Sequence, residues 1–168
     1  MTKVLLEMSE LHSVPCEDDI ELGPLSEEVL TDLAPLAEHK DIVLNCSGGA
    51  LIIGSDTLLY RLVFNLVENA IRYSRPGSTV NVSICDNDSH VFLRVEDQGP
   101  GIPKQYRESI FQPFFRLDKS RSRAYGGAGL GLALVWEIAA LHGGTVEVEA
   151  SSENGATMLT TLPKRTAA

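Results

Sequence analysis

The sequence predicts an α/β fold, because three segments with the apolar spacing of helices are interspersed with short segments in which alternate residues are apolar. Of the 168 residues, 43% are hydrophobic and 22% are charged, a balance typical of one globular domain with a sizeable core. No apolar run in the sequence approaches the ~20 residues that span a bilayer, so we expect no direct membrane contact from this segment.

Charge is distributed unevenly along the chain. The formal net charge of −9 argues against nucleic-acid binding, which usually needs a basic face. Residues 1–41 contain eleven acidic and two basic side chains, whereas residues 104–123 contain six basic and two acidic ones. A basic segment in an acidic protein indicates a local anionic ligand.

The cysteines and histidines indicate neither a disulfide scaffold nor a transition-metal site. The three cysteines are far apart and form no C-x-x-C pair, and the four histidines form no H-E-x-x-H motif. We therefore expect reduced thiols and a cytoplasmic location.

The first helix is expected at residues 25–39, after a peripheral segment at residues 1–18 that resembles the remnant of a preceding helix or linker. Ser26 and the acidic residues after it suit a capped first turn, and Pro35 predicts a kink or break. The predicted apolar stripe consists of Leu25, Val29, Leu33 and Leu36.

Two further helices are expected at residues 55–74 and 129–142. The first of them has the strongest helical pattern in the chain, with Ser55 or Asp56 as its N-cap. Its apolar face is so broad that most of the helix should be buried. That face consists of Leu58, Leu59, Leu62, Val63, Leu66, Val67, Ala70 and Ile71.

Strands account for most of the remaining apolar residues. Residues 42–46 and 50–53 are separated by a serine and two glycines, which makes a hairpin plausible. Residues 98–127 are rich in glycine, proline and charge, which predicts a long functional loop with one short helix near residues 104–111. Further strands are expected around Val80–Ile84, Val91–Val95, Thr145–Glu149 and Ala156–Leu162.

A polar stripe interrupts the most apolar helix. Asn65 and Asn69 are four residues apart and share one face, which Arg61 and Arg72 extend. Amide oxygens can bind Mg²⁺ and an arginine can bind phosphate, so the stripe could form the floor of a ligand pocket. A stripe that simply faces water is the alternative.

A second motif, Asp97 to Ile102, directly follows a predicted strand. An aspartate at this place can accept a hydrogen bond from an exocyclic amine, and Gly99 and Gly101 allow the backbone to approach a flat ring. A tight turn that needs the glycines is the alternative.

A third motif, Gly126 to Leu132, opens the last predicted helix, and a basic segment precedes it. Glycines at a helix N-terminus present free N–H groups to an anion. The basic side chains immediately upstream include Arg116 and Lys119. Together the two segments predict a mobile lid over a polyphosphate, whereas separately they fit a hinge and a solvated loop.

In this order, the motifs resemble those of the catalytic and ATP-binding domain of bacterial sensor histidine kinases, part of the ATPase group shared with gyrase, Hsp90 and MutL. The resemblance covers about residues 19–163 and leaves a short tail at residues 164–168. It implies the Bergerat-type two-layer α/β sandwich, with a mixed sheet of about five strands, three main helices on one face and a mobile ATP lid. The motifs are the N box Asn65–Ser74, the first glycine box Asp97–Ile102, the phenylalanine box Phe111–Arg116 and the second glycine box Gly127–Leu132.

The resemblance also implies roles for individual residues. Asn69 would coordinate Mg²⁺ with Asn65 nearby, and Glu68 is a candidate polariser in the chemistry. Arg72 stands where the family commonly has lysine and would contact phosphate or ribose. On the adenine side would lie Tyr73, Asp97, Gly99, Gly101 and Ile102, and on the phosphate side Arg116, Lys119, Gly127, Gly129, Leu130, Gly131 and Leu132.

The implied activity is transfer of the γ-phosphoryl group of MgATP to a histidine on a separate dimerisation domain, and from there to an aspartate of a response regulator. Gyrase-type hydrolases carry a glutamate where Asn65 stands, and this glutamate serves as a base that activates water. Because the glutamate is absent here, the resemblance favours phosphoryl transfer over hydrolysis. His12 does not match the family's phosphoacceptor motif, so we expect a fragment of a longer kinase, with a stand-alone ATP-binding protein as the competing explanation. The resemblance further implies that the fragment is a monomer and that the longer kinase is membrane-anchored. A regulatory ATP-binding module, anti-sigma-like or degenerate, is the alternative.

Overall fold

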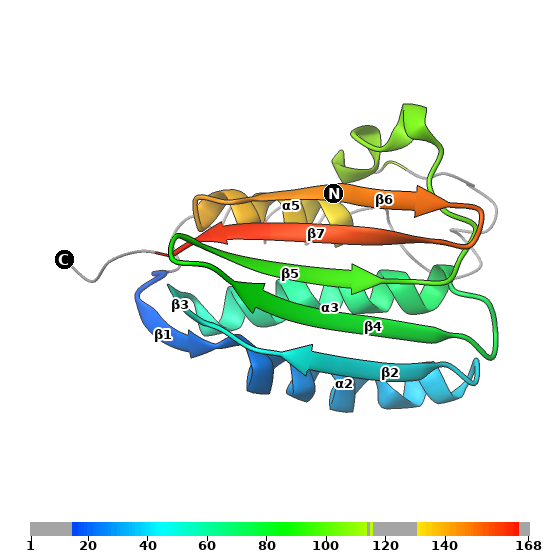
Figure 1. Ribbon diagram of the computed structural model, residues 1–168, viewed down its shortest axis with the longest axis horizontal. Helices are drawn as coiled ribbons and strands as arrows, with labels where there is room; N and C mark the ends of the chain where they lie inside the picture. Colours follow the sequence, from blue (N-terminus) through cyan, green and yellow to red (C-terminus); the bar gives the residue numbers. More distant parts are fainter. Residues whose placement is uncertain (1–14, 114, 116–130, 165–168) are drawn as a thin grey trace.

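Three helices cover one face of a five-stranded sheet in the computed structural model (Figure 1). The structure describes residues 15–113, 115 and 131–164. This architecture confirms the expected two-layer α/β sandwich with a mixed sheet. In chain order, the elements are β1 (Asp18–Glu21), α2 (Leu22–Glu38), β2 (Val43–Gly48), β3 (Leu51–Gly54), α3 (Asp56–Tyr73), β4 (Thr79–Asp86), β5 (His90–Glu96), the 3₁₀ turns η2 (Lys104–Tyr106) and η3 (Ser109–Phe111), α5 (Gly131–Leu141), β6 (Thr145–Ser152) and β7 (Gly155–Pro163).

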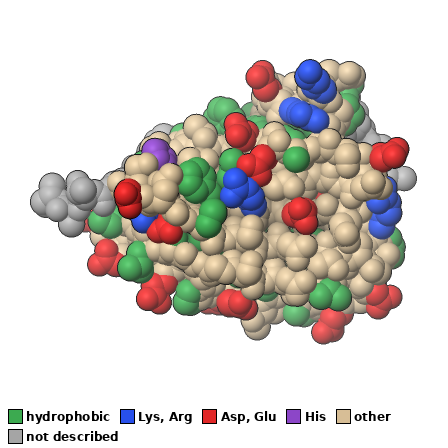
Figure 2. Space-filling model, viewed as in Figure 1, with side chains coloured by type: hydrophobic (Ala, Val, Ile, Leu, Met, Phe, Trp, Pro, Cys, Tyr) green, Lys and Arg blue, Asp and Glu red, His purple; other side chains and the backbone are tan. Residues whose placement is uncertain are grey.

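The main sheet has the strand order β2-β4-β5-β7-β6. β2 pairs with β4 in parallel, and the other neighbours are antiparallel. The uncovered face of the sheet carries scattered charged and apolar side chains, with acidic groups along the α2 edge and basic groups on the projecting η2–η3 segment (Figure 2). No helix among the described residues is long and apolar enough to cross a membrane.

The predicted hairpin between residues 42–46 and 50–53 is wrong. β2 joins the main sheet, whereas β3 pairs antiparallel with β1 in a separate two-stranded sheet. Gly48 at the end of β2 has a φ of +80°, which redirects the chain instead of folding β3 back along β2. The backbone N–H of Leu22 then donates to the carbonyl of Ala50 at 3.0 Å and fixes the new path.

Helix α2 differs from its prediction in three ways. It begins at Leu22, so Ser26 lies buried inside the helix and does not cap it. Leu36 is 38% exposed, and the inward position is taken by Ala37. The predicted break at Pro35 does not occur, because the helix continues for three residues beyond it.

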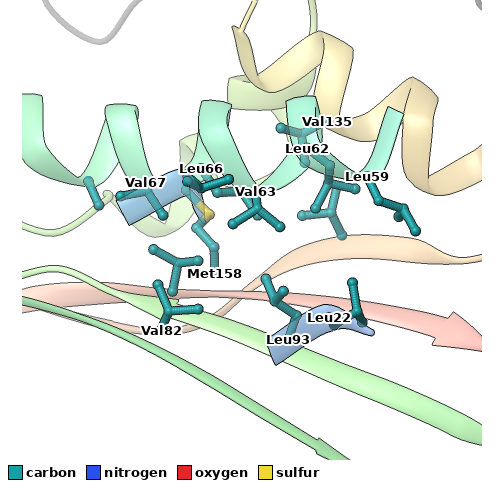
Figure 3. Packing of buried hydrophobic residues seen from close by; sticks show 14 of the residues in the cluster. Leu22, Leu59, Leu62, Val63, Leu66, Val67, Val82, Leu93, Val135 and Met158 are labelled. Atoms are coloured by element: carbon teal, nitrogen blue, oxygen red, sulfur yellow. The ribbon is translucent and has the colours of Figure 1, made fainter. Parts of the chain in front are cut away.

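Helix α3 confirms its prediction, including the N-cap. The Oγ atom of Ser55 accepts a hydrogen bond from the backbone N–H of Leu58 at 3.2 Å. All eight predicted apolar residues are buried. Figure 3 shows residues such as Val63 and Leu66 packed toward Leu93 and Met158 of the sheet, so that α3 is the central element of the helical layer.

The remaining elements differ from their predictions in two places. Two 3₁₀ turns, η2 and η3, replace the single short helix expected near residues 104–111. β6 runs to Ser152, beyond the expected end at Glu149, with a bulge between Val148 and Ala150. This extension brings the end of β6 beside the first glycine box.

Candidate functional site

The polar stripe of α3 is half-buried. Asn65, Glu68, Asn69 and Arg72 are all of intermediate exposure. The Oε1 atom of Glu68 lies 3.6 Å from Nη2 of Arg72, and each of these side chains is 29% exposed. Partial exposure makes the pair weak, but it holds the guanidinium along the helix.

The second glycine box meets the N box where α5 begins. A Cβ atom added to Gly131 would lie 4.0 Å from Oδ1 of Asn65. The first residue of α5 therefore faces the amide of Asn65, although 66 positions separate the two in the sequence. A helix N-terminus is favourable for an anion, which makes this junction suitable for phosphate oxygens and a metal ion that they share.

Asp97 is buried directly after β5, with 8% of its surface exposed. Its Oδ1 accepts hydrogen bonds from the backbone N–H groups of Gly99 at 3.0 Å and Ala156 at 3.1 Å. Among the described residues, Oδ2 accepts none and so remains available to a donor such as an adenine amino group. Burial raises the pKa of Asp97, the two N–H groups oppose this rise, and the charge of Glu96 adds to it.

The glycines of the first glycine box are required by close contacts. A Cβ atom on Gly99 would lie 2.2 Å from the carbonyl oxygen of Tyr73, at the end of α3. Gly101 has a φ of +81°, and a Cβ atom there would lie 2.0 Å from the carbonyl oxygen of Ser152. The loop is therefore held between α3 and β6, and glycine is needed at both positions.

Some of the residues that position the site carried no signal in the sequence, whereas Ser74 is the last residue of the N box. Ser151 Oγ accepts the backbone N–H of Ile102 at 2.6 Å, and Ser74 Oγ accepts that of Gln98 at 3.2 Å. Lys40 donates to carbonyl oxygens at the end of α3. These side chains bind backbone groups, which every residue has, so no residue pattern identifies their partners.

The described residues fit Mg²⁺ held by amide oxygens. Among them, no three His, Cys, Asp or Glu side chains form a group that could hold a metal ion. Asn65 and Asn69 each offer an amide oxygen that could bind Mg²⁺, and phosphate oxygens and water suit the rest of an octahedral Mg²⁺ shell. The expected ATP lid and five of the expected phosphate-side residues lie outside the described part of the chain: Arg116, Lys119, Gly127, Gly129 and Leu130. Leu132, which the structure does describe, is half-buried and packs against the core.

Residues 54–166 match the family of histidine kinase-, DNA gyrase B-, and HSP90-like ATPases. The chain belongs to this family. It is 36% identical to the sensor-like histidine kinase SenX3 of Mycobacterium tuberculosis over 168 residues, which covers 97% of this chain and 41% of SenX3. The Escherichia coli sensor protein RstB is 50% identical over 99 residues, which covers 59% of this chain and 22% of RstB.

Solved structures of this ATPase family agree with the fold. The mycobacterial sensor histidine kinase MprB has a TM-score of 0.77 at 31% identity, covering 89% of this chain and 98% of that one. A nucleotide-free catalytic domain of the histidine kinase ThkA has a TM-score of 0.75 at 27% identity, covering 88% of this chain and 96% of that one. The domain is thus of the histidine kinase type, which fits the kinase interpretation and not the regulatory module. The chain spans about two fifths of the length of SenX3.

Proposed function

We propose that this domain binds MgATP and transfers the γ-phosphoryl group to a histidine on a separate dimerisation domain. One observation supports it above the others: three motifs distant in the sequence meet on α3. The N box lies on this helix, Gly99 contacts its end at Tyr73, and Gly131 faces Asn65. A ligand that requires an amine acceptor, a metal site and an anion site along one helix matches a nucleoside triphosphate with its metal.

The proposal gives each group a task. The free Oδ2 of Asp97 accepts the adenine amino group, while Gly99, Gly101 and Ile102 lie along the base with Tyr73. Asn69 and Asn65 hold Mg²⁺, which would neutralise charge on the phosphates, and Arg72 binds phosphate or ribose. The ion pair with Arg72 leaves Glu68 close to this region as a candidate polariser.

The remaining expected residues complete the phosphate side of the proposed site. Arg116 and Lys119 would reach the phosphates from the lid. The backbone N–H groups of Gly127 to Leu132 would surround the triphosphate, because glycine-rich helix starts are favourable for anions. Phosphoryl transfer depends mainly on such positioning and charge stabilisation.

The setting of the reaction is also proposed. The catalytic unit spans residues 19–163 and acts in the cytoplasm, where a dimerisation domain of the same kinase supplies the phosphoacceptor histidine. A response regulator receives the phosphoryl group on an aspartate. The names of the relatives, which are sensor kinases longer than this chain, support this arrangement.

Calorimetric titration with a non-hydrolysable ATP analogue, with and without Mg²⁺, tests the binding step. Labelled ATP and a histidine-containing dimerisation domain then test transfer. We expect the ATP analogue to bind only with Mg²⁺. We also expect the label to reach the histidine of the dimerisation domain only when the catalytic domain is present with it. Binding without transfer would indicate a regulatory module, and release of phosphate without an acceptor would indicate a hydrolase.

A further inference from the structure

Lys40 lies in the turn between α2 and β2 and binds the C-terminal end of α3. Its Nζ donates to the carbonyl oxygens of Ile71 at 2.9 Å, Arg72 at 2.9 Å and Ser74 at 2.8 Å. The last carbonyl groups of a helix lack intrahelical partners, and the negative end of the helix dipole favours a cation there. An ammonium group with three N–H donors suits this place.

We propose that Lys40 is a positioning residue of the nucleotide site, which fixes the end of α3 and the first glycine box relative to each other. This inference rests on the proposed function of that site. The three carbonyl oxygens that Lys40 binds are main-chain groups, and one of them belongs to Arg72. Lys40 acts through Arg72 and Tyr73, which belong to the helix end that it binds, and through the loop that begins at Asp97.

The turn that carries Lys40 is shaped by its own backbone. Asp41 has a φ of 56°, the left-handed conformation that ends many helices. The N–H of Asp41 donates to the carbonyl of Glu38 at 3.0 Å, and that of Ile42 donates to the carbonyl of Ala37 at 2.9 Å. These two bonds form a Schellman motif, which fixes the position of Lys40 relative to α2.

The backbone of Lys40 strengthens the same connection. Its carbonyl oxygen accepts the N–H of Gly77 at 3.0 Å, in the segment between α3 and β4. Lys40 therefore binds this region through both its side chain and its main chain. Partial burial lowers the pKa of Lys40, because desolvation disfavours the charged form. Since burial opposes the charged form, the hydrogen bonds to the carbonyl oxygens are what favour the ammonium group at this place.

A short chain of hydrogen bonds connects Lys40 to the first glycine box. The carbonyl oxygen of Ser74 accepts a hydrogen bond from Lys40, and its Oγ accepts one from the backbone N–H of Gln98 at 3.2 Å. Gln98 lies between Asp97 and Gly99, and its own Oε1 accepts the N–H of Thr79 at 2.7 Å. Movement of the helix end would thus shift Gln98 and the backbone beside Asp97, whose carboxylate is proposed to bind adenine.

Lys40→Met tests the proposal, because it keeps most of the aliphatic stem and removes the ammonium group. We expect the Kd of a Mg²⁺-bound ATP analogue to rise about tenfold, a size typical of members of one hydrogen-bond network. We also expect the amide resonances of Gln98 and Gly99 to shift. Lys164→Met removes a matched charge that pairs with Asp86, and it should keep the wild-type Kd.

A second control separates positioning from stability. Leu33→Ala removes buried side-chain volume from α2 and should lower the melting temperature without changing the Kd, measured where each variant is folded. If Lys40→Met does not fold, Lys40→Gln, which keeps a donor, replaces it in the same comparison. An unchanged Kd in the folded Lys40 variant would overturn the inference. Wild-type protein that binds no nucleotide would instead overturn the proposed function.

Discussion

Asp97 and Ala156 exchange two hydrogen bonds between the residue that follows β5 and the start of β7. The backbone N–H of Asp97 donates to the carbonyl of Ala156 at 2.9 Å, and the N–H of Ala156 donates to Oδ1 of Asp97 at 3.1 Å. The carboxylate is therefore oriented by the sheet before any ligand binds. This orientation leaves Oδ2 as the atom that can distinguish one base from another.

Asp97→Asn should remove the preference for adenine. The amide oxygen can keep the bonds from Gly99 and Ala156, so the amide nitrogen takes the place of Oδ2 and presents a donor to the adenine amino group. We expect the Kd for ATP to rise by about ten- to a hundredfold and the margin over GTP to shrink. Calorimetry with ATP and GTP analogues measures both values.

The exposed aspartate Asp86 provides the control for this change. Asp86→Asn removes the same charge far from the base site and should leave both Kd values at their wild-type levels. An Asp97→Asn protein that prefers ATP by the wild-type margin would show that Asp97 does not read the base.

Asn69→Ala should abolish the Mg²⁺-dependent part of ATP binding without unfolding the domain. The change removes an amide oxygen proposed to bind the metal, while alanine favours a helix over asparagine by about 0.5 kcal/mol. Titration with and without Mg²⁺ tests the metal role, and thermal denaturation tests the fold. Asn45→Ala, which removes an amide from the edge strand β2, is the control. Unchanged Mg²⁺-dependent affinity would remove Asn69 from the metal role.

The parts of the fold and site that the sequence predicted are those set by local chemistry. Helix α3 follows from its own apolar face and its Ser55 cap. The motif also identified Gly99 and Gly101 as positions that need glycine, but it did not predict their contacts with Tyr73 and Ser152. The separation of β2 from β3 was missed because it depends on pairing with β4 and β1, which no local pattern encodes. Lys40 was missed because its partners are carbonyl groups more than 30 positions away.

The pKa of Tyr60 should respond to Asp32. The Tyr60 hydroxyl donates to Oδ2 of Asp32, and this bond, followed by burial and the charges of Asp32 and Glu28, raises the pKa of Tyr60 from 10.0 to about 12. A raised folded pKa means that the interaction stabilises the fold fully below pH 10 and is lost as the pH rises through about 12.

Titration of phenolate absorbance in the wild type, Asp32→Asn and Tyr60→Phe measures this interaction. The signal lost in Tyr60→Phe identifies the titration of Tyr60 among the four tyrosines. We expect Asp32→Asn to lower the pKa of Tyr60, because the amide carries no charge and accepts a weaker hydrogen bond. An identical titration curve in Asp32→Asn would show that Tyr60 on α3 does not donate a hydrogen bond to Asp32 on α2.

Thr160→Val should stabilise the domain. Thr160 lies on β7 with 0% exposure, and its Oγ1 has no hydrogen-bond partner among the described residues. Valine has nearly the same shape and avoids burying a hydroxyl group without a partner, so we expect a gain of about 1 kcal/mol in the free energy of unfolding. Urea denaturation measures this gain as a higher midpoint with an unchanged slope. Thr161→Val, at the neighbouring half-buried position, should change the free energy by less, and a loss of stability in Thr160→Val would show that the hydroxyl is satisfied.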